Sequence, residues 1–293
     1  MKTIDIPSVK FNYSTFDSED IEIIKLDELF HRRSKMDHDP NKPHRVYFYL
    51  MLYIEQGEGS HFIDFNHCPF TKGSFIFINK NQIQAFALNS NIKGQAVLFT
   101  EAYIEQIQTN MNVSVFSPTH LHTSYSPVFR PSSSLTKSCI SLLSEIRKEM
   151  TQKDKSNLII MFLFSSMFTM LERERPQAYA TKLSKPQARQ FSNFIALLDT
   201  KFTEERNASY YSDSSHITYK ALNNLCRLAT NQTAKQLIDS HIIIEAKRRL
   251  TLEKKHVQEI ALDLGFEEVS NFVKYFKKHT LITPSQFKKQ SES

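Results

Sequence analysis

The side chains best suited to binding chemistry lie in one stretch near the C-terminus, from Val257 to Lys289. Polar and cationic residues recur there at helical spacing, and a helix would bring them to one face: Ser270, Asn271, Lys274, Lys277 and Lys278. Small polar groups can hydrogen-bond to the edges of bases, and the cations beyond them can reach phosphates. The pattern is the one that a helix entering the major groove of DNA needs.

Apolar residues in the same stretch predict the two helices that would position this face. Ile260, Ala261 and Leu264 form one side of a first helix, and Gly265 follows where a left-handed C-cap favours glycine. Phe266 fills the corner, and the second helix carries an apolar seam: Val269, Phe272, Tyr275 and Phe276. An amphipathic helical hairpin with a solvated basic face is the alternative interpretation of this pattern.

Two further features favour a helix-turn-helix. Thr283 and Pro284 begin a new helix directly after the basic end, since proline suits the first helical position. The stretch also repeats at a constant offset of 50 residues, with these pairs at matching positions: Leu222 and Phe272, Arg227 and Lys277, Thr230 and Thr280, Thr233 and Thr283, Gln236 and Gln286, Leu237 and Phe287. The unit therefore occurs twice.

The first copy spans roughly residues 209–227. Its recognition helix begins at Thr218, a natural N-cap, and its inward-facing leucines leave four polar residues for the groove: Lys220, Asn223, Asn224 and Arg227. Between the copies, Ala234 to Leu250 predicts a spacer helix roughly 25 Å long. That length suits two readers on adjacent major-groove faces, which recur about every 34 Å.

This pair of units resembles the DNA-binding domain of the AraC family of bacterial transcription regulators. The second unit carries the family's spacing at these positions: Ile260-Ala261, Gly265-Phe266, Ser270, Phe272, Phe276-Lys277-Lys278, Thr283-Pro284 and Phe287. Two positions depart from the pattern, because Leu281 stands where the family usually has glycine and Lys288 where it usually has arginine. A left-handed Leu281 would cost roughly 1–2 kcal/mol.

The helix faces and the resemblance together predict the residues that contact DNA: Thr218, Tyr219, Lys220, Asn223, Asn224, Arg227, Val269, Ser270, Asn271, Lys274, Lys277 and Lys278. Asn224 and Lys274 match positions that contact bases in the family. Arg227 and Lys277 lie one helical turn later and are expected to hold phosphate.

Size and composition suit two globular domains, with 293 residues, 40% hydrophobic and 12% aromatic. Residues 1–184 hold 20 Lys and Arg against 19 Asp and Glu, whereas 185–293 hold 17 against 12, so the basic excess lies where phosphate binding requires it. The three cysteines are scattered and the N-terminus does not resemble a signal peptide. No apolar run reaches the roughly 20 residues of a membrane span. We therefore expect a cytoplasmic protein.

The N-terminal part has strand character, with aromatic and β-branched runs at 45–54, 60–65 and 74–78 and a glycine-containing turn at 55–59. Short strands with tight turns predict a small antiparallel barrel. Roughly residues 20–125 resemble the cupin-like sensor domain of many AraC-type regulators, on these features: Pro43-His44-Arg45, Gly57-Glu58-Gly59, Gly73 to Ile78 and Asn81-Gln82-Ile83.

The barrel is expected to hold a small organic effector, with these residues as its lining: Arg33, His44, Tyr47 and Tyr49. The alternative is that the aromatic residues only pack the core. A metal-binding cupin would need clustered histidines and a carboxylate. The one His-x-His pair, His120 and His122, lies in a polar segment beyond the strands. We therefore expect neither a metal nor a cofactor.

A connector rich in serine and proline, 124–134, precedes two helices. The first carries an apolar stripe: Leu135, Cys139, Leu142, Ile146 and Met150. The second, at 158–171, is apolar on nearly every side, so it is either a core helix or a subunit interface. The expected division is a sensor domain at 1–125, a helical linker and candidate dimerisation region at 126–184, and a DNA-binding domain at 185–293.

The sequence thus predicts an α+β multidomain chain: a cupin-like antiparallel β-barrel, a helical linker and an all-α domain with two helix-turn-helix units. The expected function is sequence-specific regulation of transcription, not catalysis. Resemblance favours an activator that binds promoter DNA and contacts RNA polymerase, and the apolar surface of the helix at 158–171 favours a homodimer. The alternatives are a cupin-type metalloenzyme with a helical appendage and a non-specific DNA-architectural protein. Base-reading side chains such as Asn224 and Asn271 argue against the second.

Overall fold

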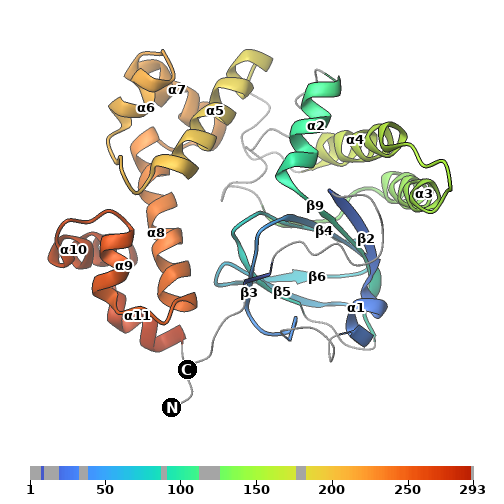
Figure 1. Cartoon of the computed structure of the whole chain (residues 1–293), viewed down its shortest axis with the longest axis horizontal. Coiled ribbons are helices and arrows are strands. Elements are labelled where there is room, and N and C mark those ends of the chain that lie inside the picture. The colour runs from blue at the N-terminus through green and yellow to red at the C-terminus, as the bar shows by residue number, and fades with distance from the viewer. Residues whose placement is uncertain are drawn as a thin grey trace. The chain divides into compact units, whose positions relative to one another are not determined.

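The computed structural model describes residues 8–9, 20–32, 39–86, 91–111, 126–175 and 183–291 (Figure 1). They belong to two compact units: a strand-rich unit, described up to residue 175, and a helical unit, described from residue 183. Arg33, His120 and His122 lie outside the described residues.

The strand-rich unit contains two five-stranded sheets. The first sheet has the order β1 (Ser8–Val9), β3 (His44–Val46), β8 (Ile83–Ala85), β5 (Gly59–Ile63) and β6 (Asn66–Phe70). The second has the order β10 (Val128–Phe129), β7 (Phe75–Ile78), β4 (Tyr49–Gln56), β9 (Lys93–Phe99) and β2 (Ile21–Lys25). Paired strands are antiparallel except for β1 and β3.

Strand β4 explains how the second sheet is buried on both faces. Successive side chains of a strand point to opposite faces, so Leu50, Leu52 and Ile54 join the core that the two sheets share. Met51 and Tyr53 instead join a core that the second sheet shares with helices. Both sets are almost fully buried. Because both faces of β4 are buried, its sequence is apolar at every position from Leu50 to Ile54 and not only at alternate positions.

The cupin-like α+β fold class is confirmed, but two details of the strand prediction are wrong. The sheets pack as two separate five-stranded layers rather than as one closed barrel. The run predicted as one strand from Arg45 to Ile54 breaks after Val46, because β3 pairs within the first sheet and β4 within the second. The chain changes sheets at Tyr47 and Phe48.

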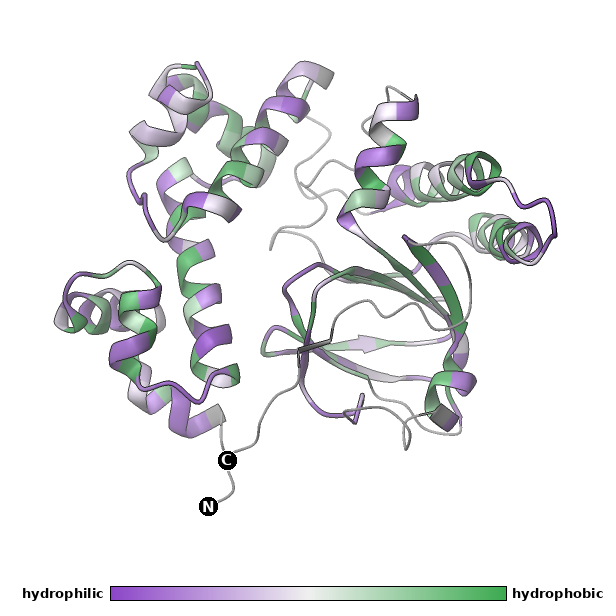
Figure 2. Ribbon diagram, viewed as in Figure 1, coloured by the Kyte–Doolittle hydropathy of each residue, from purple (hydrophilic) through white to green (hydrophobic). Residues whose placement is uncertain are grey.

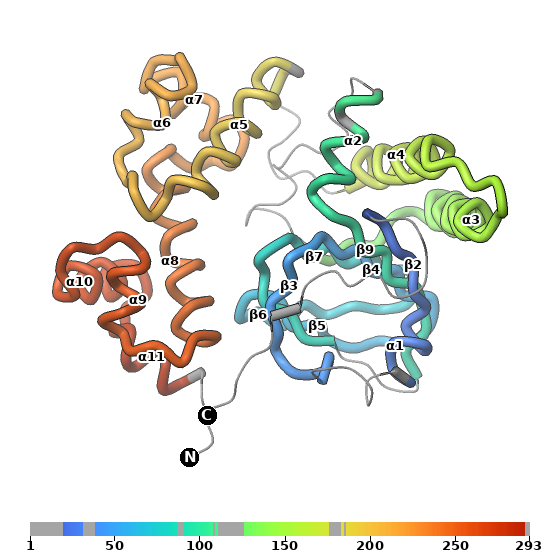
Figure 3. The backbone as a smooth tube through the Cα atoms, viewed as in Figure 1, coloured from blue at the N-terminus to red at the C-terminus, as the bar shows by residue number. Residues whose placement is uncertain are grey.

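Four described helices accompany the sheets: α1 (Leu26–Arg32), α2 (Glu101–Met111), α3 (Ser133–Met150) and α4 (Asn157–Glu174). Side chains of Ser132 and Ser156 cap α3 and α4 at their N-termini. Hydrophobic residues recur along both helices (Figure 2), and α2, α3 and α4 lie on the side of β9, β4 and β2 (Figure 3). The stripe of α3 is as predicted except that Leu143, and not Leu142, is fully buried.

Helix α4 is mostly a core helix. Its buried side chains pack against the second sheet, and Phe164 and Phe168 contact the ring of Phe99 edge-on. Its first two turns nevertheless leave large apolar side chains in solvent: Leu158, Ile159 and Phe162 are 49%, 46% and 54% exposed. The nearly all-apolar sequence therefore serves a core on one side and an uncovered patch on another.

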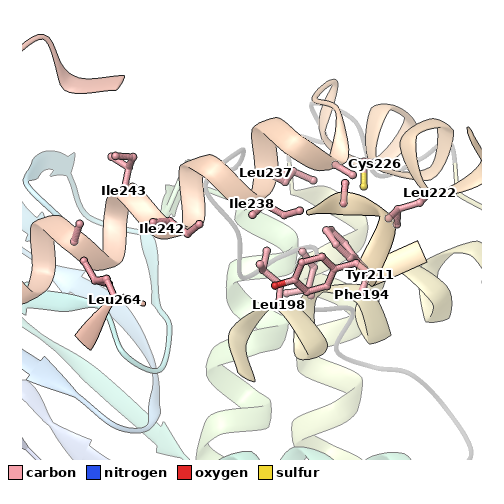
Figure 4. Packing of buried hydrophobic residues seen from close by; sticks show 14 of the residues in the cluster. Phe194, Leu198, Tyr211, Leu222, Cys226, Leu237, Ile238, Ile242, Ile243 and Leu264 are labelled. Carbon is pink, nitrogen blue, oxygen red and sulfur yellow. The ribbon is translucent and has the colours of Figure 1, made fainter. Parts of the chain in front are cut away.

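The helical unit comprises α5 (Lys185–Lys201), α6 (Ala208–Ser214), α7 (Tyr219–Thr230), α8 (Ala234–Leu252), α9 (Val257–Asp263), α10 (Val269–Thr280) and α11 (Pro284–Ser291). One core joins them. Leu237 and Ile238 of α8 lie beside Leu222 and Cys226 of α7, and further along α8 the side chain of Ile242 lies toward Leu264 (Figure 4). Helix α8 thus runs between two helix-turn-helix units.

The internal repeat is confirmed in three dimensions. Thr233 with Gln236, and Thr283 with Gln286, make the same reciprocal hydrogen bonds at the start of α8 and α11. The recognition helices also end alike, because the residues after them, Asn231 (φ +60°) and Leu281 (φ +69°), are left-handed. Asparagine adopts this conformation readily, whereas leucine adopts it at a cost of roughly 1–2 kcal/mol.

Replacing Leu281 with glycine is expected to raise the free energy of unfolding by about 1 kcal/mol, because glycine adopts a left-handed backbone without the clash of a Cβ. The leucine side chain is 83% exposed, so its removal sacrifices almost no burial. The matched control is Asn231→Gly, which should change stability by only a few tenths of a kcal/mol. Urea unfolding of the full chain measures both; a destabilised Leu281→Gly protein would contradict the strain assigned to this residue.

Candidate nucleic-acid interface

The first candidate reading surface is the outer side of α7. Thr218 caps the helix through a hydrogen bond from the Ala221 backbone N–H at 3.1 Å. Beyond the cap, Tyr219 is half exposed, and Lys220, Asn224 and Arg227 are exposed. Leu222, Leu225 and Cys226 are buried on the opposite side. Helix α7 therefore presents an aromatic ring, an amide and two cations to solvent.

The second candidate reading surface is the outer side of α10. Ser270, Asn271, Lys274, Lys277 and Lys278 are all exposed, while Phe272 and Phe276 are buried beneath them. The Ser270 hydroxyl donates to the Glu268 carboxylate at 3.1 Å, and Val269 packs partly into the core. The lysines of the last turn also lie where the helix dipole favours positive charge. The exposed side is thus strongly basic toward the C-terminal end of the helix.

Asn223 lies differently from the other predicted contacts. Its side-chain oxygen accepts a hydrogen bond from the Ala234 backbone N–H at 3.0 Å, and its amide nitrogen donates to the Tyr219 carbonyl at 3.3 Å. The residue is half-buried. The amide oxygen therefore attaches α7 to the first turn of α8, and the amide nitrogen bonds back to the preceding turn of α7, which leaves little of the amide for a base.

Helix α8 has 19 residues, which corresponds to roughly 28 Å. It starts directly after the end of α7 and leads to α9, so one rigid element separates the two readers. Glu245 and Arg248 are buried on it, with the Glu245 carboxylate 3.6 Å from Arg248 and 3.2 Å from Arg249. The buried charges of Glu245 and Arg248 are therefore paired on a part of α8 that other elements cover.

The strand-rich unit contains a chain of buried polar side chains that belongs to the first sheet. His61 Nε2 lies 2.8 Å from the Gln84 oxygen, and the Gln84 nitrogen lies 2.6 Å from His44 Nε2. His44 Nδ1 in turn lies 2.9 Å from the Lys42 carbonyl. The pattern is satisfied if each histidine is neutral, with His61 donating from Nε2 and His44 from Nδ1. Phe86 contacts both imidazole rings.

Burial lowers the pKa of His61 to about 4, although the hydrogen bond with Gln84 acts in the opposite direction. The ring is therefore uncharged at neutral pH. His61 lies two residues before Ile63 on β5, so it shares the face that packs into the core between the sheets. His44, Gln84 and His61 together form a group of hydrogen-bonded polar side chains inside an apolar core, which we call the His–Gln–His cluster.

The three predicted effector residues that the structure describes do not come together. His44 lies in the His–Gln–His cluster, whereas Tyr49 stacks on Phe99 in the core that faces the helices. Tyr47 lies at the change of sheets, is 38% exposed and has the Arg45 guanidinium 5.6 Å from its ring centroid. The break between β3 and β4 removes the alternation that would have put both tyrosines on one face.

No group of three or more His, Cys, Asp or Glu residues among the described parts of the chain could hold a metal ion. None of the described helices is long and apolar enough to cross a membrane.

Comparison with known families identifies both halves of this arrangement. Residues 25–159 match the family model of the AraC-like ligand binding domain, and residues 211–290 match that of a helix-turn-helix domain. The chain belongs to the AraC family of transcription regulators. It therefore pairs a ligand-binding-type domain with a DNA-binding domain that contains two helix-turn-helix units.

Curated relatives of similar length support this assignment. The transcriptional activator RhaR of Klebsiella pneumoniae is 21% identical over 255 residues, which cover 85% of this chain and 88% of the relative. RhaR of an Enterobacter species is 22% identical over 253 residues, which cover 85% and 87%. The relatives are named as transcriptional activators, which supports regulation of transcription over the metalloenzyme that the sequence left as an alternative.

Among solved structures, the chain is similar to ToxT at lower sequence identity. ToxT from Vibrio cholerae has a TM-score of 0.45 and 13% identity over 92% of this chain and 98% of its own. A structure of ToxT with a bound unsaturated fatty acid has a TM-score of 0.43 and 15% identity over 83% and 87%.

Sequence reasoning missed the His–Gln–His cluster and the structural task of Asn223. The strand pattern offered a signal for the first, because His61 lies two residues before the core residue Ile63 and Gln84 lies between Ile83 and Ala85. No comparable signal existed for Asn223, because Ala234 is 11 residues away and faces it only after the chain turns between α7 and α8.

Asn223 and Asn224 are neighbours with different expected roles, the first in stability and the second in DNA binding. Asn223→Ala is expected to lower the free energy of unfolding by about 1 kcal/mol, because it leaves the Ala234 N–H without its acceptor. Asn224→Ala should leave stability unchanged, because that side chain is exposed, and should weaken DNA binding by about 1–3 kcal/mol if it reads a base. Thermal melting and DNA titration of the two proteins distinguish these outcomes; equal stability losses would contradict the division of tasks.

Proposed function

We propose that this AraC-family regulator is a transcription activator that reads two adjacent DNA subsites with α7 and α10 and responds to a small organic molecule bound by its strand-rich unit. The observation that carries the proposal is the pair of exposed basic recognition helices on one spacer helix. Activation is the function named for the relatives that match over 85% of the chain.

The exposed side chains of each reader divide into two tasks. Asn224 and Lys274 lie near the middle of their helices and have the polar heads needed at base edges. Arg227, Lys277 and Lys278 lie one turn later and are suited to phosphates. Tyr219, Lys220, Ser270 and Asn271 flank the first turn of each helix, where recognition helices meet bases. Thr218 and Val269 hold the starts of the two helices, and they approach DNA there.

Base readers and phosphate holders are expected to give different signatures. Lys274→Ala should cost about 1–3 kcal/mol on the best duplex and alter the ranking of duplexes at one position. Lys277→Ala should weaken binding to all duplexes alike and reduce the slope of log affinity against log salt by about one unit. The duplexes to use are those recovered genome-wide with the tagged protein, titrated at several salt concentrations.

Lys274→Ala protein that keeps the wild-type ranking would show that Lys274 does not read bases. Wild-type protein that binds recovered and random duplexes equally would favour the non-specific architectural function instead. Metal analysis of the purified protein adds an independent check, since a stoichiometric metal would argue for the metalloenzyme alternative.

The effector site is proposed at the His–Gln–His cluster. Of the four predicted lining residues, His44 is the described one that faces the core between the sheets together with other polar groups. Imidazole and amide groups that are neutral can exchange their mutual hydrogen bonds for bonds to a ligand, and the ring of Phe86 can pack against its apolar part. Arg33 and the two tyrosines remain proposals as lining residues.

A compound that binds at this cluster is expected to raise the melting temperature of the wild-type protein and not that of His44→Gln. His67→Gln, which changes an exposed histidine of the same unit, should respond as wild type does. Thermal-shift screening with a library of small organic acids, sugars and amines provides the measurement. Full response of His44→Gln would place the effector elsewhere, and no response in wild type would count against a sensor.

Dimerisation through α4 is proposed from the apolar patch of Leu158, Ile159 and Phe162. Each large apolar side chain that is fully buried contributes about 1.5–3 kcal/mol, and a contiguous exposed patch marks an interaction site. A two-fold dimer would also present four readers to paired half-sites. Contact with RNA polymerase and a cytoplasmic location belong to the same proposal, since an activator needs both.

Intact protein at micromolar concentration is expected to have twice its chain mass of 34.1 kDa. Phe162→Glu should restore the monomer, because it puts a charge into the apolar patch. Ser144→Glu is the matched control, since it adds the same charge at an exposed polar position of α3. Sedimentation equilibrium measures all three; a monomeric wild-type protein, with and without DNA, would reject the dimer.

A further inference from the structure

Asp239, in the second turn of α8, gathers polar groups from two helices. Its Oδ1 atom accepts hydrogen bonds from the Tyr275 hydroxyl of α10 and from Lys235 Nζ of α8, each at 2.7 Å. His279 of α10 has its Nε2 atom 4.0 Å from Oδ2. The Asp239 side chain is only 14% exposed. A recognition helix is therefore bonded directly to the spacer helix.

Tyr275 is suited to this bond. Burial, together with the bond to the Asp239 carboxylate, raises the pKa of its hydroxyl, so the group stays protonated and donates. The ring packs against Phe266 and His279, at centroid distances of 5.4 and 4.8 Å. The apolar packing places the ring, and the hydroxyl adds a directional bond to a charged acceptor.

A second contact ties the same region to the loop between α5 and α6. The Arg206 guanidinium donates to the Leu264 carbonyl at 2.8 Å and lies 3.5 Å from the ring centroid of Phe266. Gly265 sits so close to this loop that a Cβ on it would lie 1.7 Å from the Thr203 carbonyl oxygen. Lys235 Nζ also approaches the Arg206 carbonyl at 3.4 Å, so it bridges both contacts.

The other recognition helix is attached to α8 by a different residue. Asn223 of α7 binds the Ala234 backbone N–H at the first turn of α8. At the offset of 50 residues, Tyr275 corresponds to Leu225 and Asp239 to Arg189, so the first copy of the unit lacks the Asp239–Tyr275 pair. A bond needed merely to fold one helix-turn-helix would be expected in both copies. This pair instead joins α10 to the helix that both copies share.

We propose that Asp239, acting through Tyr275, is a positioning residue that fixes the orientation of α10 on α8 and thereby selects DNA by the spacing between its two subsites. The inference rests on the proposed function, since it requires that both α7 and α10 read DNA. Two readers held at one separation and one angle bind well only where both subsites fit at once. A freely pivoting α10 would accept several spacings.

Four variants test the pair. Tyr275→Phe removes one hydroxyl and keeps the ring that packs on Phe266. Asp239→Leu removes the acceptor, whereas Asp239→Asn keeps an oxygen that can accept from Tyr275. Glu204→Gln is the control for lost negative charge, because its carboxylate pairs with Lys201 on the exposed surface. Thermal melting confirms that each protein folds, and Tyr275→Phe carries the test if Asp239→Leu does not.

The probes are three duplexes derived from the one that the full-length wild-type chain binds best in a random-sequence library. The first is that duplex unchanged. The second has one base pair inserted between the subsites, which are assigned to α7 and α10 by their sensitivity to Asn224→Ala and Lys274→Ala. The third has the α10 subsite scrambled. The dissociation constant is measured for every protein on every duplex.

Wild type, Glu204→Gln and Asp239→Asn should prefer the unchanged duplex over the inserted one by about tenfold, a difference comparable to the worth of one hydrogen bond to a charged acceptor. Tyr275→Phe and Asp239→Leu should reduce this preference to about twofold and leave affinity for the scrambled duplex unchanged. A full preference in Tyr275→Phe, or equal weakening on all three duplexes, overturns the positioning role alone. A wild-type chain that selects no sequence overturns the proposed function, and the inference with it.

Discussion

The arrangement of the DNA-binding half depends on the burial of one helix by two copies of the same unit. Ala234, Leu237 and Ile238 of α8 pack in the first copy, and Ile242, Ala246 and Leu250 continue the same core toward the second. An amphipathic surface helix would offer one apolar stripe, but α8 must satisfy neighbours on several sides along its length. Its direction and helical phase therefore determine where both recognition helices can lie.

Features that depend on short-range physics could be predicted from the sequence. The turn at Gly265, the cap at Thr218 and the start of α11 at Pro284 lie where local backbone preferences place them. Leu281 is an exception, because leucine as a residue type disfavours the left-handed conformation that it adopts here. The cost of a left-handed leucine left a different local C-cap open, but Leu281 adopts the same conformation as Asn231, 50 residues earlier in the repeat.

Features that depend on distant partners could not be predicted. Asn223 was expected on the outer side of α7, but it is half-buried and its amide oxygen bonds to the start of the next helix. Tyr49 was predicted to line the effector site together with Tyr47, because one continuous strand was expected through Phe48. The chain instead changes sheets there. Gln84 and His61 are 23 residues apart and meet only when β5 pairs with β8. Periodicity describes one element at a time, and these contacts arise between elements.

The polar side chains of a recognition helix are therefore not all available to DNA. Asn223 caps α8, the Thr218 hydroxyl caps α7, and the Ser270 hydroxyl binds Glu268. Burying or orienting a polar group commits its hydrogen bonds, and each such commitment removes one group from the reading surface. What remains on α7 and α10 is a smaller set of exposed amides and cations. Under the proposed function, specificity comes from those few groups together with the distance between the two helices that carry them.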